Sequence, residues 1–306
     1  MKIAVITPVS HLPDILPLLK EKGHKLFLHE ESSKSEVREA LLGNKIDAII
    51  CNPNQQTYLI DRALLKDTGV TLINTCSTGT NHIDLEYCRS AGIKVQSLKM
   101  DTDLLNELPS TAELSFGLML SLLRKIPQGS KDVEEFKWDY IPHLGRQVKD
   151  LKIGIVGYGR LGKMMSGYCD AFGADTYICD PYSSEPSISL VEMFETCDVI
   201  SLHVHVTPDT KYMINEDLLK HIRGECYIIN TSRGEIVNEK DIVDSLSRGV
   251  LTGYGTDVVE DEFDDLTKSP IIKAMKAGKN VIVTPHVGGM TIEGQTKAYK
   301  WSIKKL

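Results

Sequence analysis

The stretch KIGIVGYGRLG, residues 152–162, decides the fold of the second half of this chain. Residues 152–156 are an apolar run typical of a buried parallel strand, and Gly157-x-Gly159-x-x-Gly162 follows immediately. Apolar residues at helical spacing come next. Glycines cluster in many turns for steric reasons alone, so the motif gains its meaning from the strand and helix around it. In this context the stretch predicts a βαβ unit that binds a dinucleotide.

The three glycines have separate tasks in such a unit. Gly157 permits the tight turn, Gly159 lets the backbone approach a pyrophosphate, and Gly162 lets the helix pack closely on the strand. The helix N-terminus offers unpaired N–H groups and a positive dipole to the phosphates. Asp180 ends the next apolar run, where a carboxylate accepts hydrogen bonds from ribose hydroxyls, and no Arg follows it to neutralise a 2'-phosphate. The sequence therefore predicts NAD rather than NADP.

The composition indicates a soluble protein of two domains. The 306 residues are 42% hydrophobic and 25% charged, which is enough apolar material for sizeable cores. No stretch approaches the roughly 18 consecutive apolar residues of a membrane span, and the N-terminus resembles a first strand rather than a secretory signal. The seven cysteines show no C-x-x-C spacing. We therefore expect reduced core cysteines, no metal site and a cytoplasmic location.

The charge balance argues against two classes of partner. A net charge of −7 and a pI near 5.7 give no electrostatic basis for binding nucleic acid or an anionic membrane. We expect a small-molecule ligand instead.

Strand and helix patterns alternate along most of the chain, which predicts an α/β protein with two doubly wound parallel sheets. Helical patterns separate the strand candidates of the first sheet, at residues 3–8, 25–29, 47–51, 72–75 and 94–98. The second sheet collects the strand candidates at residues 152–156, 176–179, 199–203, 227–230, 251–256 and 281–284.

Residues 109–124 predict a helix that is apolar over most of its circumference. Ser110 and Glu113 stand at capping-box spacing at its start. Such a helix must be buried on several sides. It is a candidate to join the domains or to form a dimer contact. Alternatively it covers one face of the second sheet, and a helix in this position could do both.

Three strand ends of the second sheet carry residues whose side chains could take part in catalysis. Arg233 follows one strand, an acidic stretch from Asp257 to Glu262 follows the next, and His286 follows the last. Ligands bind beyond the carboxyl ends of strands in open α/β sheets. Each residue alone is more often a surface Arg, a solvated acid or a loop His. An Arg, an acid and a His that converge beside a nicotinamide are what reduction of a 2-keto acid requires.

The motifs together resemble the D-isomer-specific 2-hydroxyacid dehydrogenase family, which includes phosphoglycerate dehydrogenase, glyoxylate and hydroxypyruvate reductases and D-lactate dehydrogenase. The resemblance covers nearly the whole chain, in the family's order. The motifs are STGTNHIDL at residues 77–85, STAE at 110–113, GYGRLG at 157–162, CDVISLHVHVTPDT at 197–210, INTSRGEIVNE at 229–239, GTDVVEDE at 255–262 and TPHVGG at 284–289.

The resemblance implies a flavodoxin-like substrate-binding domain, residues 1–98 plus 287–306, and a Rossmann NAD-binding domain, residues 99–286, with a cleft between them. It implies an NAD-dependent D-2-hydroxyacid dehydrogenase, acting on a small 2-keto or 2-hydroxy acid, in a homodimer.

By the same resemblance, the catalytic residues are Arg233, Glu262 and His286. Arg233 would bind the substrate carboxylate and the C2 oxygen, and His286 would exchange a proton with that oxygen. Glu262 would stabilise the imidazolium; it is chosen over Glu260 and Asp261 because it lies five residues after Asp257, as in the family.

Two further groups of residues are implied. The cofactor would be bound by Gly157, Gly159, Arg160, Leu161, Gly162, Asp180, His205, Thr231, Ser232, Asp257 and Gly288. The substrate carboxylate would be bound by backbone N–H groups of Ser77, Thr78 and Gly79.

The chain also departs from the family pattern. Residues 52–57 lack the basic residues that phosphoglycerate dehydrogenases carry there, which disfavours a phosphorylated substrate. His205 stands where the family usually has Pro, and His203 is expected to be a structural residue at a strand end. The chain ends at Leu306, earlier than is usual. We therefore expect one final helix that returns to the first domain, and no appended regulatory domain.

Two alternative functions remain. C-terminal-binding-protein corepressors use the same scaffold to sense NAD(H), although this chain has no low-complexity tail for recruiting partners. Dehydrogenases for formate or phosphite are also related, but the formate enzymes have Gln where Glu262 stands. The sequence does not name the particular 2-keto acid.

Overall fold

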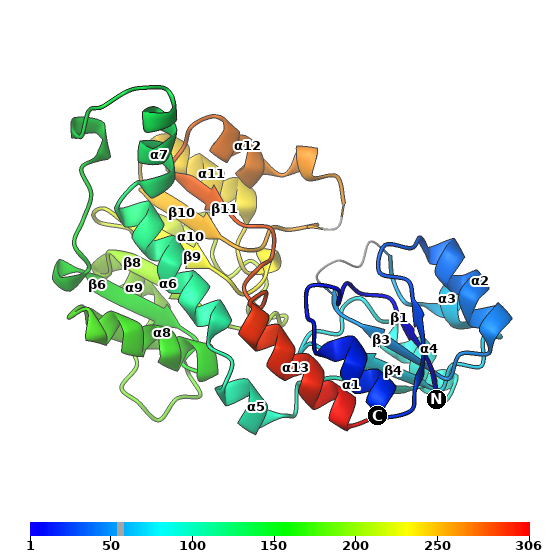
Figure 1. Ribbon diagram of the computed structural model, residues 1–306. Helices are drawn as coiled ribbons and strands as arrows, with labels where there is room; N and C mark the ends of the chain where they lie inside the picture. The colour runs from blue at the N-terminus through cyan, green and yellow to red at the C-terminus, as the bar shows by residue number, and fades with distance from the viewer. Residues whose placement is uncertain (54–57, 263) are drawn as a thin grey trace. The chain divides into compact units, whose positions relative to one another are not determined.

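The computed structural model describes residues 1–53, 58–262 and 264–306, which form two compact units (Figure 1). Unit 1 comprises Met1–Leu108 and Gly289–Leu306, and unit 2 comprises Pro109–Gly288. The sequence-based boundary at residues 98/99 differs from this division, because residues 99–108 belong to unit 1. The reason is a small apolar cluster in which Leu98 and Leu104 pack with Ala298 of the C-terminal helix.

Unit 1 contains a parallel sheet in the order β2-β1-β3-β4-β5. Its strands are β1 (Lys2–Val5), β2 (Lys25–Leu28), β3 (Ala48–Cys51), β4 (Leu72–Thr75) and β5 (Lys94–Gln96). Its helices are α1 (Ile15–Glu21), α2 (Lys34–Asn44), α3 (Arg62–Leu65), α4 (Leu85–Ser90), α5 (Thr102–Asn106) and α13 (Ile292–Lys304).

The C-terminal helix α13 belongs to unit 1, as the sequence predicts. It packs beside α1 (Figure 1) and buries Tyr299 and Ile303 in the core under the sheet. Asn74 of β4 holds it through two buried hydrogen bonds: the Asn74 side chain donates to the Ser302 carbonyl at 3.0 Å, and the Ser302 hydroxyl donates to Asn74 Oδ1 at 2.5 Å. Residues from the two ends of the chain therefore pack in the same hydrophobic core.

Unit 2 contains a parallel sheet in the order β11-β10-β9-β8-β6-β7. Its strands are β6 (Lys152–Val156), β7 (Asp175–Cys179), β8 (Val199–Leu202), β9 (Tyr227–Asn230), β10 (Gly253–Thr256) and β11 (Val281–Val283). The chain leaves β6 toward β7 on one side and returns to β8 on the other. The carboxyl end of β6 is therefore the topological switch point where ligands bind in such sheets.

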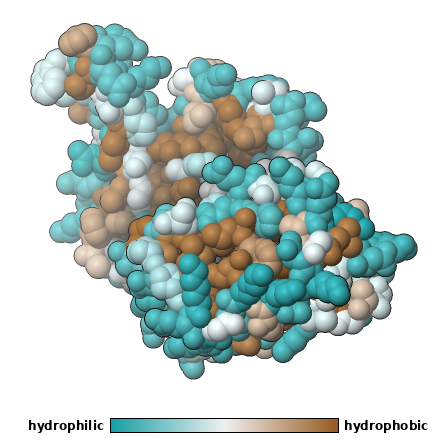
Figure 2. Space-filling model, turned by 45° about the vertical axis from the view of Figure 1, so that its right-hand side comes forward, coloured by the Kyte–Doolittle hydropathy of each residue, from teal (hydrophilic) through white to brown (hydrophobic). Residues whose placement is uncertain are grey.

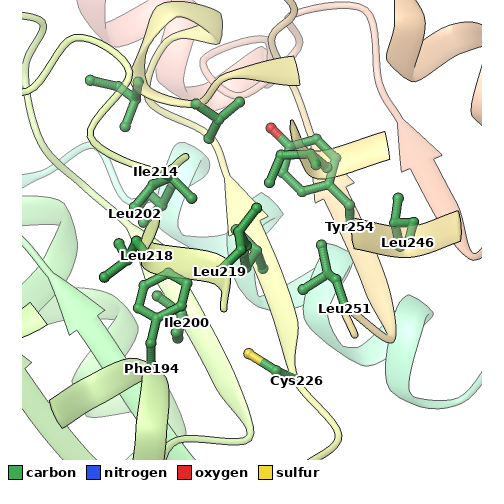
Figure 3. Packing of buried hydrophobic residues seen from close by; sticks show 14 of the residues in the cluster. Phe194, Ile200, Leu202, Ile214, Leu218, Leu219, Cys226, Leu246, Leu251 and Tyr254 are labelled. Atoms are coloured by element: carbon green, nitrogen blue, oxygen red, sulfur yellow. The ribbon is translucent and has the colours of Figure 1, made fainter. Parts of the chain in front are cut away.

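Helices cover both faces of this sheet. The helices of unit 2 are α6 (Ser110–Leu123), α7 (Ile126–Glu134), α8 (Arg160–Ala171), α9 (Leu190–Thr196), α10 (Glu216–Leu219), α11 (Glu239–Arg248) and α12 (Pro270–Lys276), of which α7 is exposed. One face is closed by a large core in which Phe194, Ile200, Leu218, Leu219 and Tyr254 meet (Figure 3).

The apolar helix α6 covers the other face of the sheet, which was one of its predicted alternatives. It contacts β9, β10, β11 and α8, and Leu118, Met119 and Leu122 are buried there. The predicted capping box is wrong: the helix already includes Ser110, and its N-cap is Pro109, which makes no side-chain cap hydrogen bond. The buried sheet contact, rather than the cap, determines where this helix lies.

Two expectations from composition concern the whole chain. The cysteines are all free, and all but the half-buried Cys179 are buried. No helix within the described residues is both long enough and apolar enough to cross a membrane.

The close packing of α8 on β6 generates a test of the fold. A Cβ on Gly162 would lie 2.1 Å from the Gly157 carbonyl oxygen, whereas a Cβ on Gly167 of the same helix would meet nothing within 4 Å. We expect Gly162→Ala to lower the free energy of unfolding by about 1–3 kcal/mol. Gly167→Ala should raise it by up to about 1 kcal/mol, because Ala favours a helix. Urea unfolding of both variants checks this; equal stabilities would contradict the close packing.

Candidate active site

The glycine turn after β6 has the geometry that a dinucleotide needs. Gly157 has φ +88, and a Cβ there would lie 2.7 Å from the His203 carbonyl oxygen, so no other residue fits. The space around Gly159 is open, since an added Cβ would meet nothing within 4 Å. Helix α8 begins at Arg160, directly behind the turn, and its first N–H groups have no partner within the helix. The turn therefore fits a pyrophosphate.

Asp180 lies where the ribose of a dinucleotide is expected. It follows β7, the strand beside β6, and its Oδ2 accepts the Tyr158 backbone N–H at 2.7 Å. Its Oδ1 accepts the Tyr182 N–H at 2.8 Å. These bonds direct the carboxylate toward the glycine turn and leave further lone pairs for hydroxyl donors. The residues present therefore fit NAD.

His286 and Glu262 come together as expected from the sequence. The two oxygens of Glu262 lie 2.8 and 2.9 Å from Nδ1 of His286, and both side chains are largely buried. The neighbouring Glu260 is engaged elsewhere, because it accepts the Tyr212 hydroxyl and its own N–H donates to Glu239. Of the acids in this stretch, Glu262 is the partner of the imidazole.

Arg233 follows β9, which is separated from β11 only by β10 in the sheet. The three predicted residues thus stand at the carboxyl ends of adjacent strands. The backbone after Arg233 touches the loop that carries Glu262: a Cβ on Gly234 would lie 2.2 Å from Glu260 N. The guanidinium donates from Nη1 to the Ser232 carbonyl at 2.6 Å, and its other N–H groups have no hydrogen-bond partner among the described residues. This arrangement can bind and polarise a carboxylate or carbonyl oxygen.

A single buried carboxylate holds the loop of His286. Asp257 is 2% exposed. Its Oδ1 accepts the Thr284 hydroxyl at 2.5 Å and the Val287 N–H at 2.8 Å, and its Oδ2 accepts the Gly288 N–H at 2.7 Å. The His286 N–H donates to the Asp257 carbonyl at 2.9 Å. Burial raises the pKa of Asp257, and these donors partly offset the rise.

Sequence reasoning assigned Asp257 and Gly288 to the cofactor and missed this structural role. The structure uses both to hold the loop, since a Cβ on Gly288 would lie 3.0 Å from Asp257 Oδ2. The signal was an acid directly after a strand together with the glycines after His286. Neither pattern reveals that Asp257 and Gly288, 31 residues apart, are hydrogen-bonded.

The remaining predicted cofactor residues lie at the same edge of the sheet. Thr231 shares a 2.6 Å hydrogen bond with Ser115 of α6, and Ser232 donates to the Leu202 carbonyl at 2.7 Å. Both side chains support the loop after β9. His205 is exposed, and Leu161 lies in the first turn of α8.

His203 is a structural residue at the end of β8, as expected. Its Nε2 lies 2.9 Å from the Ser201 hydroxyl, and burial lowers its pKa to about 4. The imidazole is therefore neutral near pH 7.

The predicted substrate loop, Ser77 to Gly79, belongs to unit 1. The Ser77 hydroxyl donates to the Gly79 carbonyl at 2.9 Å. The backbone N–H groups of Ser77, Thr78 and Gly79 have no hydrogen-bond partner among the described residues, so they are available to an anion. Of the neighbouring loop 52–57, for which the sequence predicts no substrate phosphate, residues 54–57 lie outside the described residues.

The hydrogen bonds of Asp257 generate a second test. In Asp257→Asn an amide NH₂ replaces one carboxylate oxygen and must face a donor. We expect the free energy of unfolding to fall by about 1–3 kcal/mol, the usual effect of leaving a buried polar group unsatisfied. Asp209→Asn is the control, because Asp209 is exposed. Thermal unfolding of both variants measures the effect; an Asp257→Asn protein as stable as the control would refute the role of this carboxylate.

Comparisons with known proteins agree with this geometry. Residues 3–102 match the family described as D-isomer specific 2-hydroxyacid dehydrogenase, catalytic domain, and residues 116–288 match its NAD binding domain. A 2-hydroxyacid dehydrogenase homolog of Zymomonas mobilis is 31% identical over 89% of this chain and 85% of its own. D-3-phosphoglycerate dehydrogenase of Haemophilus influenzae is 32% identical over 85% of this chain and 62% of its own.

The chain spans only 55–64% of the length of three phosphoglycerate dehydrogenases that it matches. Among solved structures, D-lactate dehydrogenase of Aquifex aeolicus, complexed with NAD and lactic acid, has a TM-score of 0.75 and 27% identity. That match covers 100% of this chain and 94% of the other.

These matches do not favour the alternative of an NAD(H)-sensing binding protein. Both units match dehydrogenase domains, and the second is an NAD-binding domain with a fitting glycine turn. The chain belongs to the D-isomer-specific 2-hydroxyacid dehydrogenases, NAD-dependent oxidoreductases that act on CH–OH groups.

Proposed function

We propose that the protein reversibly reduces a small, unphosphorylated 2-keto acid with NADH, and that His286 is the acid and base of the reaction. The observation that carries the proposal is the Glu262–His286 pair, with Arg233 two strands away at the same sheet edge. NAD, when bound, supplies and accepts the hydride. The chain itself must bind the carboxylate, polarise the carbonyl and move one proton.

The geometry supports a separate task for each side chain. Glu262 engages Nδ1 of His286 and stabilises the imidazolium that forms in the oxidative direction. Proton exchange with the C2 oxygen is assigned to Nε2. Arg233 is always charged, so it binds the carboxylate and the C2 oxygen with charge-assisted hydrogen bonds. The N–H groups of Thr78 and Gly79 are assigned to the same carboxylate. Because the family is D-isomer specific, we assign the D-isomer of the 2-hydroxy acid as the substrate or product.

A panel of keto acids tests the reaction. We expect NADH oxidation, followed by absorbance, with at least one of glyoxylate, hydroxypyruvate, pyruvate or a branched-chain keto acid. His286→Ala should lower turnover by about two orders of magnitude or more, because proton transfer is lost. NADH binding, measured by fluorescence, should persist.

His221→Ala is the matched control, since His221 lies on the surface of the same unit beside Glu195. It should retain turnover. If no acid of the panel is reduced although NADH binds, or if His286→Ala keeps full turnover, the proposed function is wrong.

We also propose that the protein is a homodimer and that residues 126–144 form the contact. The sequence predicts α6 as the dimer contact, but much of the apolar surface of α6 packs on the sheet of its own unit. The exposed apolar surface follows directly after it: Phe136 is 99% and Trp138 91% exposed, and α7 has no buried residue. In Figure 2, brown atoms lie among teal and white ones on the part that projects at the upper left. Concentrations of exposed aromatic residues mark association sites.

Light scattering tests the dimer. We expect twice the chain mass of 34.0 kDa for the wild-type protein. A Phe136→Ser, Trp138→Ser double variant should be monomeric at micromolar concentration, because the apolar contact is lost. The exposed Tyr182 lies outside the segment, so Tyr182→Ser should leave the dimer intact. A monomeric wild-type protein, or a dimeric double variant, would overturn this contact.

A further inference from the structure

A buried chain of hydrogen bonds lies behind the loop from Ser77 to Gly79 in unit 1. Nε2 of His82 lies 3.2 Å from the Thr75 hydroxyl, and that hydroxyl lies 2.9 Å from the Ser77 hydroxyl. Ser77 donates to the Gly79 carbonyl at 2.9 Å. Thr75 is fully buried and His82 is 6% exposed. The chain therefore connects a core imidazole directly to the loop assigned to the substrate carboxylate.

The direction of every proton in this chain follows from its last bond. Because the Ser77 hydroxyl donates to Gly79, its oxygen accepts the proton of Thr75. Thr75 has then used its own proton, so its oxygen accepts from Nε2–H of His82. The order is His82 to Thr75 to Ser77 to the Gly79 carbonyl, and it requires the tautomer of His82 that carries its proton on Nε2.

The surroundings of His82 agree with that tautomer. Its Nδ1 is buried and has no hydrogen-bond partner among the described residues, which fits a lone pair better than an N–H. Burial lowers the pKa of His82 to about 4, so the ring is neutral near pH 7. The Cys51 thiol lies 3.4 Å from Nε2, and burial raises the pKa of Cys51 well above its usual value, so it remains uncharged.

Metal binding does not explain the pair of Cys51 and His82. No group of three or more metal-ligating side chains occurs among the residues that the structure describes. The neutral ring and the buried hydroxyls instead form a purely hydrogen-bonded support.

The loop that this chain holds has backbone N–H donors available. With the Gly79 carbonyl tied to Ser77, the N–H groups of Thr78 and Gly79 remain without partners among the described residues. We propose that His82 is a positioning residue, which acts through Thr75 and Ser77 to orient these N–H groups toward the substrate carboxylate. This inference rests on the proposed function, because it assigns a supporting residue to the same carboxylate site.

Substitutions at His82 test the inference. Gln can place its amide N–H near the position of Nε2, whereas Asn reaches only to the position of Nδ1, and Leu has no donor. We expect His82→Leu and His82→Asn to raise the KM for the 2-keto acid about 3- to 10-fold, the effect of one lost hydrogen bond. The Ki of oxamate, an unreactive analogue with the same carboxylate, should rise equally. His82→Gln should restore both values to within about twofold of wild type.

The kcat and the Kd for NADH should change less than about threefold, because the chain supports only carboxylate binding. Thr75→Val, which keeps the volume but removes the hydroxyl, should reproduce the effect of His82→Leu. The two changes together should raise KM no more than either alone, since they break the same chain.

Ser302→Ala controls for general destabilisation. It removes a buried hydrogen bond to Asn74, the residue before Thr75, without touching the chain. It should lower the melting temperature but leave KM and the Ki of oxamate unchanged. If the wild-type protein reduces no keto acid, the proposed function fails. If it does reduce one, but folded His82→Leu binds substrate and oxamate like the wild type, or His82→Gln is as impaired as His82→Asn, the role of His82 fails alone.

Discussion

The carboxylate of Asp257 is the interaction on which the candidate active site depends. His286 has φ +53, a left-handed conformation that costs a non-glycine residue about 1–2 kcal/mol. The loop keeps this conformation because the carboxylate accepts the Thr284 hydroxyl and two successive backbone N–H groups. In the loop so held, Nδ1 of His286 meets Glu262 at 2.8 Å. The Asp257 carboxylate thus stabilises the loop that contains both the left-handed conformation of His286 and its contact with Glu262.

The parallel sheet of unit 2 supplies the second constraint. Its order places β9, β10 and β11 side by side, so three segments separated by dozens of residues end at one edge. Glycines then allow the loops at this edge to approach one another closely. Gly234 allows the loop after β9 to touch the loop after β10, and Gly288 allows the turn after His286 to approach Asp257. The contact at Gly234 leaves no room for a Cβ, and a Cβ on Gly288 would press tightly against the Asp257 carboxylate.

The sequence predicts the strands and the dinucleotide turn well, because apolar runs and glycine spacing are local signals. The Glu262–His286 pair could also be anticipated, since strand ends of a parallel sheet converge. Contacts between residues far apart in the chain leave no such local signal in the sequence. The sequence could not show that Leu104 packs on Ala298, so residues 99–108 were placed in the other domain. The spacing of Ser110 and Glu113 likewise did not reveal that α6 already includes Ser110, since burial on the sheet determines where this helix lies.

The two units offer an anion different kinds of donor. Unit 2 offers the guanidinium of Arg233, which is charged at every relevant pH. Unit 1 offers backbone N–H groups, and their support is a neutral imidazole with buried hydroxyls, which carry no charge near pH 7. In the proposed function, the donors assigned to unit 1 therefore bind the carboxylate without changing their own charge near pH 7. In the proposed reaction, by contrast, His286 must gain and lose a proton, and Glu262 at its Nδ1 is placed to stabilise the charged form.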